Sequence, residues 1–470
     1  MKRALKVCLL SFGGLMLTVY QASALSLDAV LLSLDQHYPP LLAARQKLSM
    51  AEGKLLQKRG AFDTKFKAKT SLVPLGYYEQ VVLDGLVEQA TPLAGLTFYG
   101  GYRLGAGEFA VYDGKKVTDG LGEIRSGFIL PLLRDNAIDL PRLEIAQAEL
   151  DLERARLGVL EKQLKFIKEA SKRYWAWVSA ARKQVLANDL LLLAQKRNQD
   201  LNQSVVLGQS PRIVLTENQT ALLKRQAKLV ETQQKQQQTA WELSLFLLRN
   251  AEGRPQLPQT PAPEGFPPLP SVDISRLNRQ LVKAFSFRPE PQDLALQLAQ
   301  NQLHRQWAEN QNLPQLDLNF GISKDLGGSD KTREPLELEA GLGFEWPLQL
   351  RKAQGLLQTL EAEKKQLEWE LRFSREEIEI ELQNLVTVLQ AAQQRVALVR
   401  AQVKVALELE TAERERFALG ATTLLVLNLR EQARADAMNE EIEALEIWFK
   451  SWAEYLAALG LLQESALALP

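Results

Sequence analysis

The sequence predicts a mainly helical chain that also carries transmembrane β-strands, arranged as two tandem repeats of helix, strand, strand, long helix and helix. Long segments repeat apolar residues every seven positions, which is typical of long packed helices. Shorter segments alternate apolar and polar residues, which is typical of strands with one apolar face. Motifs from the first half of the chain recur in the second half. We expect the helices to form an α-helical barrel and the strands a β-barrel.

The first 24 residues are predicted to be a cleaved signal peptide. Lys2, Arg3 and Lys6 give a positive start, and a mostly apolar run from 7 to 19 follows. Ala22-Ser23-Ala24 then supplies small residues at the cleavage positions. A permanent membrane anchor would need roughly 20 apolar residues, and this run is shorter. The sequence therefore predicts an exported protein.

Composition excludes several functional classes. The chain has 57 Lys and Arg against 57 Asp and Glu, so it lacks the basic excess of a nucleic-acid-binding protein. Its only cysteine, Cys8, lies in the predicted signal peptide, which leaves no thiol chemistry in the mature chain. The only histidines, His37 and His304, give little support to histidine catalysis or a metal site. No phosphate-binding G-x-x-x-x-G-K-[ST] loop occurs. We therefore predict no enzyme, no metal and no cofactor.

Two motifs of the first half have a counterpart in the second. Phe-x-x-Pro is found at 128–131 and 344–347, and Leu207-Gly208-Gln209-Ser210 corresponds to Leu419-Gly420-Ala421-Thr422. Seven prolines between Pro255 and Pro270 cannot be accommodated in a helix and indicate an extended connector. The predicted units are a first repeat (25–253), a Pro-rich linker (254–271) and a second repeat (272–470).

Each half contains very long helices. From Pro141 to Leu207 is 67 residues, which is roughly 100 Å of helix. Because helical patterns resume after Gly208 and Gly420, each long helix must turn back there, and the result is two antiparallel hairpins. The predicted buried rows are Leu143, Leu150, Leu157, Leu164, Val178, Val185 and Leu192 in the first half, and Leu371, Ile378, Leu385, Ala392, Val399 and Ala406 in the second.

Four segments alternate like strands, at 62–69, 124–130, 316–323 and 336–346. A soluble sheet packed on a core is the usual explanation, but here every helix belongs to a hairpin and none is free to cover the sheet. A transmembrane barrel is favoured instead. We interpret 72–120 as an enlarged extracellular loop with an extra hairpin, although additional barrel strands are possible. The candidate lumen residues are Lys65, Lys67, Lys69, Asp317, Glu337 and Glu339.

Four further motifs make the resemblance to a known family specific. They are Arg288-Pro289-Glu290, the segment 310–316, Phe128-Ile129-Leu130-Pro131-Leu132-Leu133-Arg134, and Gly420-Ala421-Thr422-Thr423-Leu424-Leu425. In this order and spacing, the chain resembles the TolC-like outer-membrane efflux duct family, the outer membrane factors of tripartite efflux pumps and type I secretion. The resemblance covers nearly all of the mature chain.

The resemblance implies a fold, a location and a set of partners. It implies a homotrimer in the outer membrane of a Gram-negative-type cell, extending into the periplasm, with each chain giving four strands to a shared twelve-stranded barrel. The function implied is a passive exit duct of a multi-component efflux or secretion system. The implied partners are a periplasmic adaptor (membrane fusion) protein, an inner-membrane transporter and outer-membrane lipid, with no nucleic acid. The cargo is not specified.

The hairpin turns are the candidate periplasmic gate. We expect ion pairs among the charges at these tips, together with an apolar collar from the last helix, to hold the closed state. The candidate residues are Gly208, Arg212, Glu217, Arg414, Arg416, Gly420 and Asn428. The alternative from another class is a periplasmic coiled-coil structural or interaction protein without channel activity, for which these would be ordinary surface charges.

Overall fold

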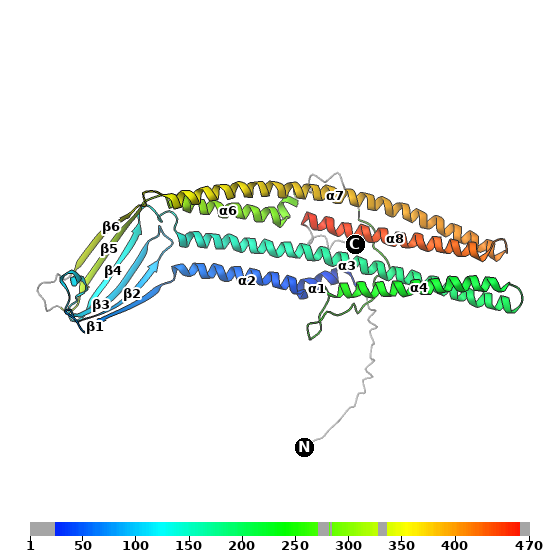
Figure 1. Ribbon diagram of the computed structural model, residues 1–470, viewed down its shortest axis with the longest axis horizontal. Helices are drawn as coiled ribbons and strands as arrows, with labels where there is room; N and C mark the ends of the chain where they lie inside the picture. Colours follow the sequence, from blue (N-terminus) through cyan, green and yellow to red (C-terminus); the bar gives the residue numbers. More distant parts are fainter. Residues whose placement is uncertain (1–23, 271–281, 283, 328–335, 461–470) are drawn as a thin grey trace, which may run out of the picture.

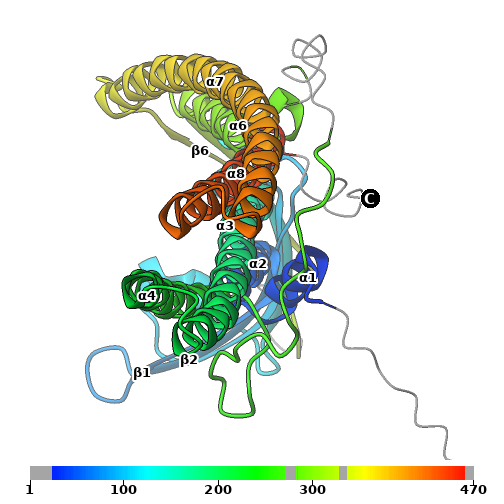
Figure 2. The same ribbon diagram turned by 90° about the vertical axis from the view of Figure 1, so that its right-hand side faces the viewer.

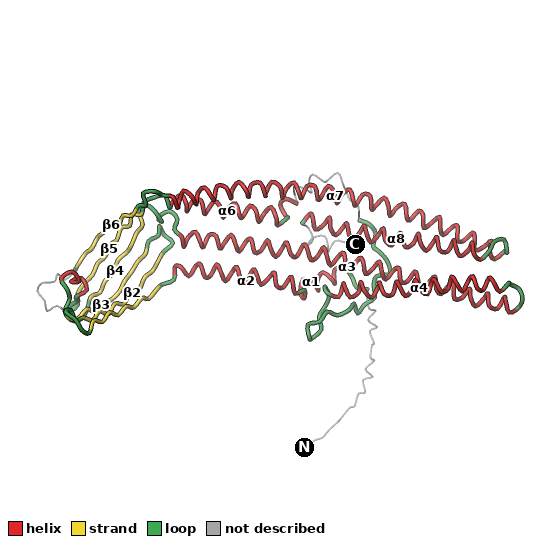
Figure 3. The backbone as a smooth tube through the Cα atoms, in the orientation of Figure 1, coloured by secondary structure: helices red, strands yellow, loops and turns green. Residues whose placement is uncertain are grey.

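The molecule is elongated, with a β-sheet at one end and helices along the rest of its length (Figure 1; Figure 3). The computed structural model describes residues 24–270, 282, 284–327 and 336–460. The predicted signal peptide therefore lies outside the described residues, except for Ala24. None of the described helices is long and apolar enough to cross a membrane.

The helices follow the predicted repeat. In the first half they are α1 (Leu27–His37), α2 (Pro39–Arg59), α3 (Leu140–Val206) and α4 (Arg212–Ser244). In the second half they are α6 (Pro289–Asn310), α7 (Arg351–Ala418) and α8 (Leu424–Leu459). Two short 3₁₀ turns, η1 (Gly60–Phe62) and η2 (Val111–Lys116), accompany them.

The long helices form two antiparallel hairpins, α3 with α4 and α7 with α8, and α3 also packs against α8. Viewed from the hairpin tips, the two pairs lie side by side (Figure 2). The predicted rows are confirmed in α7, where Ile378 and Leu385 are buried. In α3 the prediction is wrong for Val185 and Leu192, which are about half exposed. A straight helix drifts from an exact seven-residue repeat, and Leu186 and Leu191 take the buried positions instead.

An aromatic core lies midway along the helices. Trp175 of α3 stacks on Phe449 of α8 with 4.3 Å between ring centroids, and Trp448 stacks on Trp452 at 5.5 Å. Phe266, from the Pro-rich segment, lies 5.6 Å from the Phe449 ring. The connector between the repeats is therefore packed onto the core where the two hairpins meet.

Six strands form one antiparallel sheet in chain order: β1 (Lys65–Val73), β2 (Gln80–Ala90), β3 (Thr97–Gly107), β4 (Glu123–Pro131), β5 (Gln315–Asp325) and β6 (Glu337–Glu345). Of the two interpretations of 72–120, the extracellular loop is wrong and the alternative of additional strands is confirmed, because β2 and β3 form a hairpin inside the sheet. The first repeat thus has four strands rather than two, and the chain has six strands rather than the four that the resemblance implied.

Candidate functional site

The strand register divides the charged and apolar residues of the sheet between its two faces. Residues directly opposite each other on paired strands point to the same side. Lys69 pairs with Asp84, Asp84 with Arg103, and Arg103 with Glu123. Following the pairs through β6 places all six predicted lumen residues on this same side, which we call the polar face: Lys65, Lys67, Lys69, Asp317, Glu337 and Glu339.

Charges on the polar face form a network centred on Asp84. Its carboxylate accepts from Arg125 at 2.5 and 2.7 Å and from Arg103 at 3.2 Å. A separate pair joins Lys67 to Glu88 at 2.6 Å. Sequence reasoning missed this network because it favoured an extracellular position for the hairpin within 72–120, away from the charges of the other strands.

The opposite side of the sheet, the apolar face, is uncovered. Phe128 stacks on Phe320 with 5.4 Å between ring centroids, and Phe98 meets Phe128 edge-on at 6.4 Å. Phe66 is 73% exposed and Leu338 is 63% exposed. The α-helices leave the sheet from one end, and none of the described α-helices lies over its faces (Figure 1). An uncovered apolar surface of this extent marks an interaction site for lipid or protein.

The two hairpin tips have the same backbone structure. Gly208 and Gly420 both adopt left-handed conformations, with φ of 70° and 69°. After each glycine the chain closes the helix in the same way: Gln209 N donates to Ser204 O, and Ala421 N donates to Arg416 O, both at 2.8 Å. This is the Schellman arrangement, in which glycine avoids the Cβ strain of positive φ.

The charges predicted at the tips pair locally. Arg414 bonds Glu410, and Arg416 lies 3.4 Å from Glu413, in both cases within α7. Asn428 accepts from Arg197 of α3 at 2.9 Å and so joins the two hairpins. Within the part of the chain that the structure describes, no ion pair joins Arg212 to Glu217. Of the apolar collar residues, Leu424 and Leu427 are buried, whereas Leu425 and Leu429 are exposed.

Sequence reasoning missed a buried ion-pair cluster between the hairpins. Glu431 of α8 is 1% exposed and lies between two arginines. Arg225 of α4 donates to it at 2.7 Å, and Arg197 of α3 donates to both carboxylate oxygens, one of them at 3.0 Å. Burial alone would raise the pKa of Glu431, but the hydrogen bonds from these arginines outweigh it and hold the pKa below its usual value.

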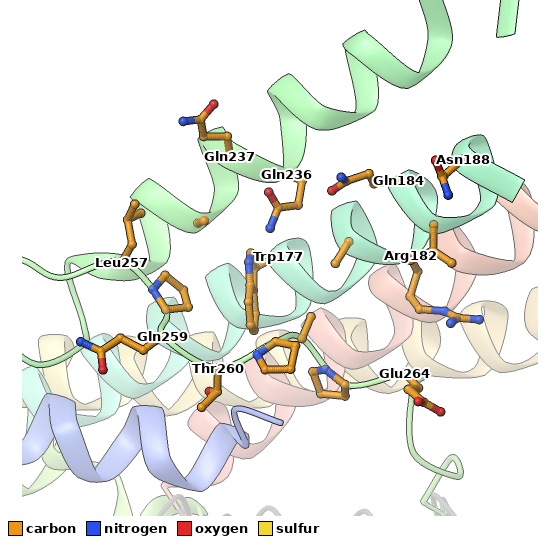
Figure 4. A pocket seen from close by; sticks show the side chains of 17 residues that line it. Trp177, Arg182, Gln184, Asn188, Gln236, Gln237, Leu257, Gln259, Thr260 and Glu264 are labelled. Carbon is orange, nitrogen blue, oxygen red and sulfur yellow. The ribbon is translucent and has the colours of Figure 1, made fainter. Parts of the chain in front are cut away.

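A cleft of about 1010 Å³ lies beside the aromatic core, between α3, α4 and the Pro-rich segment. Figure 4 shows Trp177 at its centre, with Gln236 and Gln237 of α4 on one side and Thr260 on the other. Its lining is mainly amide and apolar, and it lacks the cluster of titratable groups that marks an active site. Among the described residues, no group of three potential metal ligands is found.

Comparison with known proteins supports the fold. No protein-family model and no curated protein matches the sequence. Solved structures do match. The outer membrane protein VceC of Vibrio cholerae has 16% sequence identity and a TM-score of 0.62, over 92% of this chain and 96% of that chain. CusC has 12% identity and a TM-score of 0.64, over 94% of this chain and 95% of that chain, and the MtrE outer membrane channel of Neisseria gonorrhoeae has 13% identity and a TM-score of 0.63, over 92% of this chain and 88% of that chain. This chain therefore has the fold of the TolC-like outer-membrane channels.

Proposed function

We propose that this protein is a passive exit duct that crosses the outer membrane and the periplasm as a homotrimer. The proposal depends on one observation: the sheet has a charged face, an uncovered apolar face and two open edges, β1 and β6. In lipid, an open edge leaves backbone groups unpaired, so the edges must be joined to other copies. Three copies of this sheet would close a barrel of eighteen strands, with lipid outside and water inside.

The two edges carry complementary charges. On the polar face, β1 presents Lys65 and Lys69, whereas β6 presents Glu337 and Glu345. None of these four side chains forms an ion pair with another described residue of its own chain. If β6 of one copy pairs antiparallel with β1 of the next and their ends nearest the helices are level, Lys65 lies opposite Glu345. Opposite charges directly across neighbouring strands contribute about 0.2–1 kcal/mol per pair.

The helices continue the duct away from the membrane. The solved structures with this fold are described as outer membrane channels, and we extend that role to this chain. In this proposal the hairpin tips meet a periplasmic adaptor, an inner-membrane transporter supplies the energy, and the duct itself catalyses no reaction. A periplasmic structural coiled coil is disfavoured, because it would have no use for a sheet with an uncovered apolar face.

Charge reversal across the edges tests the assembly. Lys65→Glu with Lys69→Glu should reduce the amount of heat-modifiable oligomer in the outer-membrane fraction. Adding Glu337→Lys and Glu345→Lys to the same chain should restore it, because the edges are again complementary. The control is Lys47→Glu with Lys54→Glu on the exposed side of α2, which should leave assembly unchanged. A soluble monomer in every case would contradict the proposal.

A further inference from the structure

The connection between β3 and β4 lies on the polar face of the sheet. Residues 108–118, which include η2, are here called the strap. The carbonyl oxygen of Lys116 lies directly over Gly105 of β3, and a Cβ at Gly105 would come within 1.9 Å of that oxygen. Gly105 faces the same way as Arg103, two residues earlier, so the strap crosses the polar side of the sheet.

Hydrogen bonds fix both ends of the strap. Glu108 N donates to Glu79 O at 2.8 Å where the strap begins. Near its end, Gly105 N donates to the Thr118 hydroxyl at 3.0 Å, and Arg103 donates to Lys115 O at 3.1 Å. The strap is therefore anchored by its backbone at the end of the sheet that lies away from the helices (Figure 1).

One side chain of the strap reaches across the sheet. Lys115 Nζ lies 2.9 Å from Glu339 on β6. The contact reaches from the strap, which follows β3, past β4 and β5 to β6. Both side chains remain largely exposed, at 76% and 68%. An exposed ion pair contributes at most about 1 kcal/mol to stability, so the backbone hydrogen bonds are what hold the strap in place. The Lys115–Glu339 pair instead places charge at the surface of the strap.

The charges beneath the strap are paired with one another: two arginines lie beside Asp84, and Glu123 lies 3.9 Å from Arg103. Arg103 and Arg125 share Asp84, and their side chains are only 18% and 23% exposed. The hydroxyl end of the Tyr99 side chain lies over Gly127, where a Cβ would come within 2.4 Å of the hydroxyl oxygen. A cavity of about 120 Å³ remains between the strap and the sheet, lined by residues that include Tyr99, Arg125 and Lys115. Lys115, Lys116, Glu337 and Glu339 are exposed charges among the described residues at this level, and Lys115 and Glu339 are the two that pair across the sheet.

We propose that the strap is a fixed constriction at the outer end of the duct, and that Lys115 and Glu339 set its selectivity between small cations and anions. The inference rests on the proposed function, because the strap lies in the path of solutes only if the polar face lines a pore. Each charge screens the other, so removing one exposes its partner to passing ions. The trimer repeats the effect in every copy.

Charge-neutralising variants in planar bilayers test the electrostatic part. In a salt gradient centred near 0.1 M, where the Debye length is about 10 Å, Lys115→Gln should shift the reversal potential toward cations and Glu339→Gln toward anions. Both shifts should shrink near 1 M salt, where that length is about 3 Å. The control is Lys116→Gln, which removes the same charge from a less exposed pair: Lys116 and Asp113 are 50% and 27% exposed, so the shift should be smaller.

A glycine substitution tests the steric part without changing charge. Gly105→Ala should displace the strap and raise single-channel conductance. Gly100→Ala, in the same strand but with no neighbouring atom closer than 4.0 Å to the new Cβ, should not. A conducting parent whose Lys115, Glu339 and Gly105 variants all keep its conductance and reversal potential overturns the strap inference alone. A parent that forms no channel overturns the proposed function and this inference with it.

Discussion

Glu431 on α8 accepts a hydrogen bond from Arg225 on α4, with 2.7 Å between the guanidinium nitrogen and the carboxylate oxygen. The two residues are 206 positions apart in the sequence, and both are buried. Together with Arg197 on α3, they tie the second hairpin to the first near the tips. If the tips form the gate of a duct, this contact is the one that opening must break.

Glu431→Gln should weaken that tie. The substitution leaves two buried arginines without a counter-charge, and breaking a buried pair in this way costs about 3–5 kcal/mol. We expect faster proteolysis at the tips and higher single-channel conductance. The double variant Arg212→Ala with Arg416→Ala should raise conductance less, because the Arg416 pair lies within α7. Glu440→Gln, at an exposed position of α8, is the control.

The same contact should make the tip sensitive to acid. The folded state holds the pKa of Glu431 below its ordinary value of 4.5. A depressed pKa contributes stability above the unfolded-state pKa, and that contribution is lost as the pH falls from about 4.5 through the lower folded-state value. Hydrogen exchange at the tips should therefore increase below that pH in the parent. The acid dependence should be reduced in Glu431→Gln, and an unchanged profile would exclude Glu431 as its source.

The tip glycines should be sensitive to substitution because of their backbone alone. Gly208→Ala and Gly420→Ala place a Cβ in open space, with nothing within 4 Å, but at positive φ. Each should destabilise its hairpin by about 1–2 kcal/mol. Gly355→Ala, also in open space but inside α7, should stabilise the helix by about 0.5–1 kcal/mol. Thermal unfolding of the three variants measures this difference in sign.

The facing of the strands can be tested by thiol labelling. In a chain without Cys8, cysteines at Lys67 and Glu339 should react with a membrane-impermeant reagent, because they lie on the polar face. Cysteines at Phe66 and Leu338 should be protected by lipid. The opposite pattern would place the apolar face toward water and remove the basis of the duct.

Sequence alone predicted the elements whose residue patterns are local. Strict alternation revealed β5 and β6, and the paired tip glycines marked the hairpin turns. The number of strands within 72–120 stayed open because Gly85, Gly100, Gly101 and Gly105 interrupt the alternation of β2 and β3. The structure explains two of these glycines: Gly101 lies against the backbone of β2, and Gly105 lies beneath the strap.

The contacts at the tips could not be predicted because they depend on distant partners. Glu431 sits in a helix rich in acids and resembles a surface residue, whereas its arginines come from two helices of the other repeat. Arg414 and Arg416 were candidates for contacts between helices, but both pair with glutamates one turn away in α7. Only the packing of α8 against α3 distinguishes the buried acid from its exposed neighbours.

The most direct test of the duct is conductance of the purified protein in a planar lipid bilayer. We predict discrete single-channel steps from an oligomer extracted from the outer membrane, with larger steps for Glu431→Gln than for the parent. A protein that partitions as a soluble monomer and produces no steps in either form would contradict the account and favour a periplasmic structural coiled coil.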